Sequence, residues 1–250
     1  MLRAPGEDGM PQLSDFQVLT FDCYGTLIDW ETGIAQALGP WLQAKGVSLT
    51  RDQMLAAFAA AEAPQQQATP DLRYPELLEH VHRAIAARFG VAPDAAAARA
   101  FGRGVRDWPA FADSADALAY LKRHYRLVIL SNVDRASFAH SARRLGVEFD
   151  AVYTAEDIGS YKPDARNFEY MLARLAEAGI ARQQILHTAE SLYHDHIPAK
   201  RLGLATCWID RRAGQAGAGA TRPPEIDVRP DFRFATLGEM AAAHRAEVGG

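Results

Sequence analysis

The chain has 250 residues, of which 48% are hydrophobic and 23% are charged, and its formal net charge is -4. This length can bury a sizeable core, either as one large domain or as a main domain with a smaller insert. The acidic balance argues against nucleic acid or an anionic membrane as a main partner, and no apolar stretch reaches the roughly 18 residues that a membrane-spanning helix needs.

The N-terminal segment predicts neither a signal nor an ordered element. Residues 1–15 read MLRAPGEDGMPQLSD, in which no apolar run follows the first charge, so we expect a short loose tail and no secretory signal. The chain has two cysteines, Cys23 and Cys207, which cannot build a disulfide framework or a cysteine zinc site. We therefore expect a cytoplasmic protein.

A buried strand comes first in the chain and a helical segment follows it. The strand is predicted over FQVLTF, residues 16–21. Residues 31–108 are rich in alanine, carry helical patterns throughout and show no strand pattern. An all-helical insert after the first strand predicts a small cap over the carboxyl edge of a sheet. The predicted division is a catalytic core of residues 13–30 and 109–250 and a helical cap of residues 31–108.

The rest of the chain alternates between helical and strand patterns. Helices are predicted over residues 114–125, 135–146, 165–179 and 234–248, and further strands over 127–130, 150–154, 184–188 and 205–209. Residues 211–227 are rich in Gly, Ala and Pro and predict a loop. This alternation predicts an α/β fold with a doubly wound, parallel, Rossmann-like sheet.

Polar side chains follow several of the predicted strands. In an open α/β sheet, ligands bind outside the carboxyl ends of the strands, so these residues are expected to meet at one edge. They are Asp22, Ser131, Asn132, Lys162, Glu190 and Asp195. Each alone is also explained by a turn or a helix cap. Their joint occurrence at the ends of the strands favours a catalytic site.

These positions carry four motifs that resemble the haloacid dehalogenase superfamily. The motifs read DCYGT at residues 22–26, LSN at 130–132, KPD at 162–164 and AESLYHD at 189–195. Within the superfamily the chain is similar to the type II, or L-2-haloacid, dehalogenases. The resemblance implies a Rossmann-like core with a cap, an aspartate nucleophile, a small-molecule substrate, no cofactor, and a possible homodimer.

Tyr24 favours a dehalogenase over a phosphatase. Phosphatases of this superfamily place an aspartate two residues after the nucleophile, where it protonates the leaving alcohol. A phenol, with a pKa of about 10, is a poor proton donor near neutral pH. A departing halide needs no proton, and DxYGT is the dehalogenase pattern in this superfamily.

The resemblance implies catalytic roles for Asp22, Thr26, Lys162 and Asp195. The Asp22 carboxylate displaces halide from the carbon beside the substrate carboxylate, and water then hydrolyses the resulting ester to a 2-hydroxyacid. Lys162 keeps Asp22 ionised, because an opposite charge nearby favours the charged form. Thr26 hydrogen-bonds Asp22 or its ester, and Asp195 pairs with Lys162 and helps to place the water.

The resemblance also implies a group of substrate-binding residues. Ser131, together with backbone N–H groups after Asp22 at Cys23 and Tyr24, holds the substrate carboxylate, and Asn132 supports the same site. The Cys23 side chain itself points to the other face of the strand end and is expected to be a buried apolar filler rather than a nucleophile.

Two positions depart from the dehalogenase pattern. The family places in its cap an arginine that receives the halide, and its sequence motif is absent here. Arg51 and Arg73 are candidates by proximity only, since each also reads as a solvated arginine on a helix. A tyrosine that the family places six residues after the lysine is Phe168 in this chain, so its hydroxyl is missing.

The fourth motif leaves a second function open. With Asp22, the acids Glu190 and Asp195 supply three carboxylates, enough for a cation such as Mg²⁺. A Mg²⁺-dependent small-molecule phosphatase, with Asp22, Tyr24, Glu190 and Asp195 at the metal, is therefore the alternative. A protein that has kept the fold for binding alone is a third possibility.

The same motif concentrates histidines. His187, His194 and His196 lie near the two acids, but their spacing fits no common transition-metal motif. We expect these side chains to form a polar rim.

Overall fold

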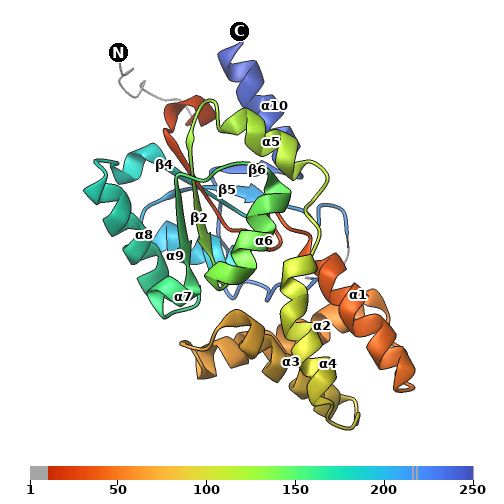
Figure 1. Cartoon of the computed structure of the whole chain (residues 1–250). Coiled ribbons are helices and arrows are strands. Elements are labelled where there is room, and N and C mark those ends of the chain that lie inside the picture. The colour runs from red at the N-terminus through yellow and green to blue at the C-terminus, as the bar shows by residue number, and fades with distance from the viewer. Residues whose placement is uncertain (1–10, 216, 218, 250) are drawn as a thin grey trace.

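The computed structural model describes residues 11–215, 217 and 219–249 and contains a six-stranded, entirely parallel sheet with the strand order β3-β2-β1-β4-β5-β6 (Figure 1). The strands are β1 (Val18–Phe21), β2 (Arg126–Ser131), β3 (Ala151–Thr154), β4 (Ile185–Ala189), β5 (Ala205–Ile209) and β6 (Phe232–Phe234). The predicted α/β fold with a parallel, Rossmann-like sheet is confirmed.

Apolar side chains of the central strands alternate between two buried clusters, one on each face of the sheet. On β1, Val18 belongs to one cluster, and Leu19 and Phe21 belong to the other. Successive side chains of a strand point to opposite faces, which is why a continuous apolar run is needed when both faces are covered.

Helices of the core cover these two faces. The smaller cluster is covered by α8 (Ala165–Glu177) and α9 (Ile197–Arg201), and α7 (Ala155–Ile158) precedes α8. The other face is covered by α5 (Ser114–Leu121), α6 (Arg135–Leu145) and α10 (Leu237–Val248). Figure 1 shows α8 and α9 on one side of the sheet and α5 and α6 on the other.

The segment between β1 and α5 is helical. It contains α1 (Trp30–Ala44), α2 (Arg51–Ala68), α3 (Tyr74–Arg88), α4 (Ala95–Arg103) and a 3₁₀ turn at Gly104–Asp107. These helices, here called the cap helices, lie together at the end of the molecule opposite α10 (Figure 1). The exact division between cap and core remains a prediction.

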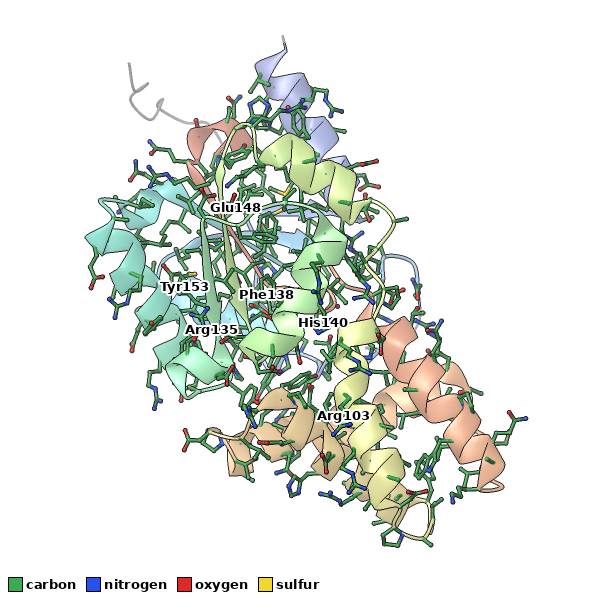
Figure 2. All side chains as sticks on the ribbon, viewed as in Figure 1. Arg103, Arg135, Phe138, His140, Glu148 and Tyr153 are labelled. Carbon is green, nitrogen blue, oxygen red and sulfur yellow. The ribbon has the colours of Figure 1, made fainter. Side chains whose placement is uncertain are left out.

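Cap and core meet beside α6. Figure 2 shows Arg103, at the end of α4, next to His140 of α6, and both residues line one cleft. The Arg144 guanidinium of α6 reaches across and donates to the Arg106 backbone carbonyl oxygen at 2.6 Å. The cap therefore contacts the core directly in this conformation.

One sequence prediction was wrong, and one strand was missed. Residues 13–15 are not part of a loose tail, because Leu13–Asp15 form a 3₁₀ turn. Leu13 is fully buried in the core, and the Tyr125 hydroxyl donates to the Leu13 carbonyl oxygen. Residues 1–10 lie outside the described residues. β6 was not predicted, because a three-residue, partly exposed edge strand leaves little apolar signal.

No helix within the described part of the chain is both long and apolar enough to cross a membrane.

Candidate active site

Asp22 stands at the carboxyl end of β1, where the chain makes a tight turn. Its backbone N–H still donates to the Thr188 carbonyl of β4, so the sheet fixes its position. The turn then closes when the N–H groups of Leu27 and Ile28 donate to the Cys23 carbonyl. Gly25 has φ 94°, and a Cβ there would stand 3.0 Å from the Trp30 indole nitrogen. Glycine is therefore required for this turn.

The Asp22 carboxylate receives a hydrogen bond on each oxygen. The Lys162 ammonium donates to Oδ1 at 2.9 Å, and the Thr26 hydroxyl donates to Oδ2 at 3.0 Å. Burial raises the pKa of Asp22, Lys162 opposes this rise, and the charge of Asp195 adds to it. A carboxylate stripped of water in this way is a stronger nucleophile than one in solution.

The Lys162 ammonium donates three hydrogen bonds at this site. The side chain is 1% exposed and donates to Asp22, to the Leu130 carbonyl at 2.9 Å and to Asp195 at 2.6 Å. Burial alone would lower the pKa of Lys162, but the carboxylates of Asp195 and Asp22 raise it. The lysine is therefore a fixed cation between two acids, and not the solvated turn residue of the alternative interpretation.

Asn132 positions Lys162 through its backbone. The Asn132 amide donates to the Lys162 carbonyl at 3.0 Å and accepts from the Lys162 N–H at 2.7 Å. Asn132 also lines the cavity beside Asp22. The structure thus gives this residue a positioning contact that the sequence did not reveal.

Two side chains, those of Lys162 and His187, contact the Asp195 carboxylate. Besides Lys162, His187 contacts Oδ1 through Nε2 at 3.0 Å, and the Nδ1 of His187 lies 2.9 Å from the Thr20 hydroxyl. Although burial favours the neutral acid, Lys162 and His187 hold the pKa of Asp195 well below its usual range. Its other oxygen, Oδ2, is buried and has no partner among the described residues.

A small cavity of about 30 Å³ lies beside these groups. Its core lining includes Asp22, Ser131, Lys162 and Asp195. The Ser131 hydroxyl is buried and has no partner among the described residues, so it is available to a ligand. A space of this size favours a small-molecule ligand.

Tyr24 and Cys23 supply no reactive side chain. The Tyr24 hydroxyl lies 3.0 Å from the Ser141 hydroxyl, and burial raises the pKa of its phenol well above the usual value. The Cys23 thiol is fully buried in the apolar core, and burial raises its pKa as well. The structure thus places Cys23 as the apolar filler that its position after the strand predicted.

The carboxylates of the fourth motif do not assemble with Asp22 as a metal site. Asp22 and Asp195 both bind the Lys162 ammonium. The Glu190 carboxyl instead accepts a hydrogen bond from Thr221 at 2.9 Å, and burial raises its pKa to about 8, so it is mostly protonated at neutral pH. Within the described residues, no group of three His, Cys, Asp or Glu side chains could hold a metal ion. The arrangement of Asp22, Tyr24, Glu190 and Asp195, the residues named for Mg²⁺ under the alternative function, therefore does not fit that ion in this structure.

The histidines of this motif are interior groups, so the predicted polar rim is wrong. His187, His194 and His196 are all buried, because β4 and the π-helical turn Leu192–His196 carry them inward. Burial lowers the pKa of His194 and of His196 to about 4, so both are neutral near pH 7. His194 lines the cavity, and its Nδ1 lies 3.1 Å from the Ser191 hydroxyl.

Neither arginine considered as a halide receiver reaches the cavity. The Arg51 side chain is 49% exposed and contacts Glu31, and that of Arg73 is 60% exposed and pairs with Glu76. Phe168 is fully buried and packs edge-on against the His187 ring at 5.0 Å between centroids. Where the family has a tyrosine hydroxyl, this chain therefore has a ring contact between Phe168 and His187, the histidine that contacts Asp195.

The cap residues that do line the cavity are Trp30, Glu62, Gln66 and Tyr74. The sequence contained a signal for two of them, because Glu62 and Gln66 continue the helical face begun by Leu55 and Phe58. Polar residues on an otherwise apolar helix face are expected to be buried and paired.

Three comparisons with known proteins bear on this site. The family model described as a haloacid dehalogenase-like hydrolase matches residues 16–188. The (S)-2-haloacid dehalogenase of Pseudomonas fluorescens is 29% identical over 134 residues, which cover 52% of this chain and 54% of that protein. The match therefore spans about half the length of this curated relative.

Solved structures share the whole fold at low sequence identity. A crystal structure of an L-2-haloacid dehalogenase matches with a TM-score of 0.73 at 23% identity and covers 94% of this chain and 100% of its own. A HAD-hydrolase of Bacillus subtilis, solved with magnesium bound, matches with a TM-score of 0.72 at 20% identity and covers 92% of this chain and 99% of its own. At these identities the likeness establishes the fold alone.

Proposed function

This chain belongs to the haloacid dehalogenase-like hydrolases, and from that premise we propose that it hydrolyses the carbon–halogen bond of small 2-haloacids. The products are the 2-hydroxyacid and halide, and no metal or organic cofactor takes part. The observation that carries this proposal is the surroundings of Asp22. An ammonium and a hydroxyl hold its carboxylate, and Tyr24, at the position where a phosphatase has its acid, turns its hydroxyl to Ser141.

In the first step, Asp22 attacks the carbon that bears the halogen. A C–O bond forms between the carboxylate and that carbon, and the carbon–halogen bond breaks with both electrons on the halide. The free Ser131 hydroxyl and backbone N–H groups of the turn after Asp22 receive the substrate carboxylate. Lys162 and Thr26 hold the attacking carboxylate in place.

In the second step, water hydrolyses the ester. Water attacks the side-chain carbonyl carbon of Asp22, and the bond between that carbon and the substrate oxygen breaks. One proton of the water passes to the substrate oxygen, the other passes to solvent, and the Asp22 carboxylate is regenerated. The unpartnered Oδ2 of Asp195 accepts a hydrogen bond from this water and so helps to place it. Because the first step inverts the substrate carbon and the second does not touch it, an L-2-haloacid gives a D-2-hydroxyacid.

A paired release assay tests the proposed function. We expect halide release from L-2-chloropropionate or L-2-bromopropionate to be undiminished by EDTA, because the cation beside Asp22 is the Lys162 ammonium. Inorganic phosphate release from small phosphoesters is measured in parallel, with and without Mg²⁺. Magnesium-dependent phosphate release without halide release would contradict the proposal, and activity on neither class would favour a binding protein.

Thr26→Val should weaken catalysis without changing the shape of the site. The buried Thr26 hydroxyl donates to Asp22 and accepts from the Glu190 N–H at 2.9 Å. Valine removes both hydrogen bonds, so we expect kcat to fall about 10- to 100-fold and the free energy of unfolding to fall by about 1–3 kcal/mol. Steady-state halide release and urea unfolding measure the two effects.

Thr26→Ser is the matched control, because serine keeps the hydroxyl and loses only a methyl group. It should retain most of the halide-release activity. Equal losses in the serine and valine variants would show that the methyl packing, and not the hydroxyl, matters at this position.

A further inference from the structure

The cap helices contribute no cation to the described residues that line the cavity. Among the described residues that line the cavity, those contributed by the cap helices are two polar side chains of α2, Glu62 and Gln66, and the aromatic residues Trp30 and Tyr74. A halide leaving from a substrate attacked by Asp22 departs on the side opposite the nucleophile, where the cap lies over the strand ends. The group that stabilises it must therefore come from this set.

Glu62 is the ionisable residue of this set that has a side-chain oxygen without a hydrogen bond to any described residue. Its side chain is buried, with the residue 3% exposed, and the Tyr74 hydroxyl donates to Oε1 at 2.6 Å. This contact fixes the carboxyl group against α3. The second oxygen, Oε2, has no hydrogen bond to any described residue, although the side chain lines the cavity.

The protonation of Glu62 changes near neutral pH. Burial raises its pKa to about 7, the Tyr74 hydrogen bond opposes this rise, and the charge of Asp22 adds to it. The carboxyl group is therefore an O–H donor below about pH 7 and an anion above it.

Two neighbouring phenols, His194 and the Lys162–Asp195 pair keep their charge state across this range. The phenols of Tyr74 and Tyr161 remain neutral, because burial raises the pKa of each above its usual value. His194 is neutral, since burial lowers its pKa to about 4. Lys162 and Asp195 remain charged within their ion pair, because the carboxylates raise the pKa of the lysine and the lysine lowers that of Asp195.

We propose that the Glu62 carboxyl group donates a hydrogen bond to the departing halogen, and that this contact replaces a cationic halide receiver in the cap. The proposal rests on the proposed function. As the Asp22 oxygen bonds to carbon, the carbon–halogen electron pair moves to the halogen, which becomes a halide ion that accepts from the Glu62 O–H. The proton stays on Glu62, and the halide leaves when the cavity opens.

This arrangement has a consequence for pH dependence and for the choice of halogen. Ionised Glu62 donates nothing and repels the halide, so kcat/KM should fall as the pH rises above about 7. A poorer leaving group depends more on stabilisation of its developing charge. Loss of the Glu62 donor should therefore slow chloride substrates more than bromide substrates.

The test compares Glu62→Gln with Glu62→Ala. The amide of glutamine keeps an acceptor for Tyr74 and a donor that does not titrate, so the fall of kcat/KM above pH 7 should disappear. Alanine removes the donor, and kcat/KM should fall about 10- to 100-fold, with a larger loss for 2-chloropropionate than for 2-bromopropionate. The proposal is overturned if the alkaline fall persists in Glu62→Gln and the alanine loss is equal for both halogens.

Two further variants separate this effect from other acids. Glu190 has a pKa of about 8 and lies outside the cavity lining, so Glu190→Gln should keep the alkaline fall. Glu76 lies on the cap surface with its side chain 45% exposed, and Glu76→Gln should behave as the wild type. An alkaline fall that is lost in Glu190→Gln would assign the titration to Glu190 and overturn the proposal.

Chloride binding gives a readout that needs no turnover. The excess line width of the chlorine NMR signal of sodium chloride reports halide held by the protein. It should decrease in the wild type above pH 7, stay constant with pH in Glu62→Gln and be small in Glu62→Ala. If the wild type releases no halide, the proposed function fails, and this measurement still decides whether Glu62 holds halide. Chloride binding that is equal in all three proteins would overturn the inference.

Discussion

Asp22→Asn is expected to abolish halide release, with kcat lowered by about 10⁴-fold or more, because the neutral amide is a poor nucleophile toward carbon. The substitution should leave the fold intact. The amide oxygen can still accept from Lys162, which keeps its contacts with Asp195 and the Leu130 carbonyl. Single-turnover and steady-state halide release, together with a thermal unfolding curve, measure the two expectations.

A matched control separates the nucleophile from a general effect of the substitution. Asp94 caps α4 at a distance from the cavity and accepts from the backbone N–H groups of Ala96 and Ala97. Asparagine caps helices about as well as aspartate, so Asp94→Asn should release halide at the wild-type rate. Residual turnover near the wild-type level in Asp22→Asn would exclude the ester mechanism.

The ester also predicts where the oxygen of water goes. Under single-turnover conditions in isotopically labelled water, the label should enter the Asp22 carboxylate, because water attacks its carbonyl carbon. Peptide mass spectrometry locates the label. Label found in the hydroxyacid alone would mean that water attacks the substrate directly.

The sheet could be predicted from sequence because its signals are local. Each strand of the buried centre is a short run of apolar residues, since both faces are covered, and Asp22 marks the end of the first run. β6 escaped prediction because it has only three residues, which are partly exposed at the edge of the sheet. The strand signal comes from burial and length, and an edge strand of only three residues has little of either.

The contacts within the site depend on which strands are neighbours, and the sequence does not state this. Lys162 could be expected near Asp22, because both follow strands whose ends meet at one edge. The contact of His187 with Thr20, which orients the histidine toward Asp195, could not be predicted, because it requires β4 to lie next to β1. The same adjacency makes His187 an interior group, whereas the turn after β4 carries His194 and His196 inward.

The fit of a metal to this site depends on the directions of the side chains. Motif spacing counts carboxylates but does not tell where their oxygens point. Glu190 turns to Thr221, a residue of the loop before β6, and an ammonium occupies the space between Asp22 and Asp195. Only the packing of that loop distinguishes the two outcomes.

Lys162→Met should lose both activity and stability, because the buried cation compensates two buried acids. Removing one member of a buried ion pair costs about 3–5 kcal/mol, since the remaining charge is desolvated and unpaired. We expect a decrease of that size in the free energy of unfolding near pH 7, measured with urea, and no measurable halide release. Lys45→Met, at an exposed pair with Asp94 at 3.8 Å, should cost at most about 1 kcal/mol.

The pH dependence of this loss follows from the carboxylates. In the wild type the pKa of Asp195 lies well below its usual range, so the stability that it contributes is present above the ordinary pKa of an aspartate and is lost as the pH falls. Without Lys162 that pKa rises, and protonation removes the unpaired charge. The difference in unfolding free energy between wild type and variant should therefore be largest near neutral pH and shrink as the pH falls through about 4.

A double variant separates the electrostatic cause from lost packing. Adding Asp195→Asn to Lys162→Met removes one of the two uncompensated charges and keeps the shape of the side chain, so much of the lost stability should return. Halide release should stay absent, because Asp22 then has no cation to hold it ionised and aimed at the substrate carbon. If the second substitution restores no stability, the lysine stabilises the fold through its packing, and its charge belongs to catalysis alone.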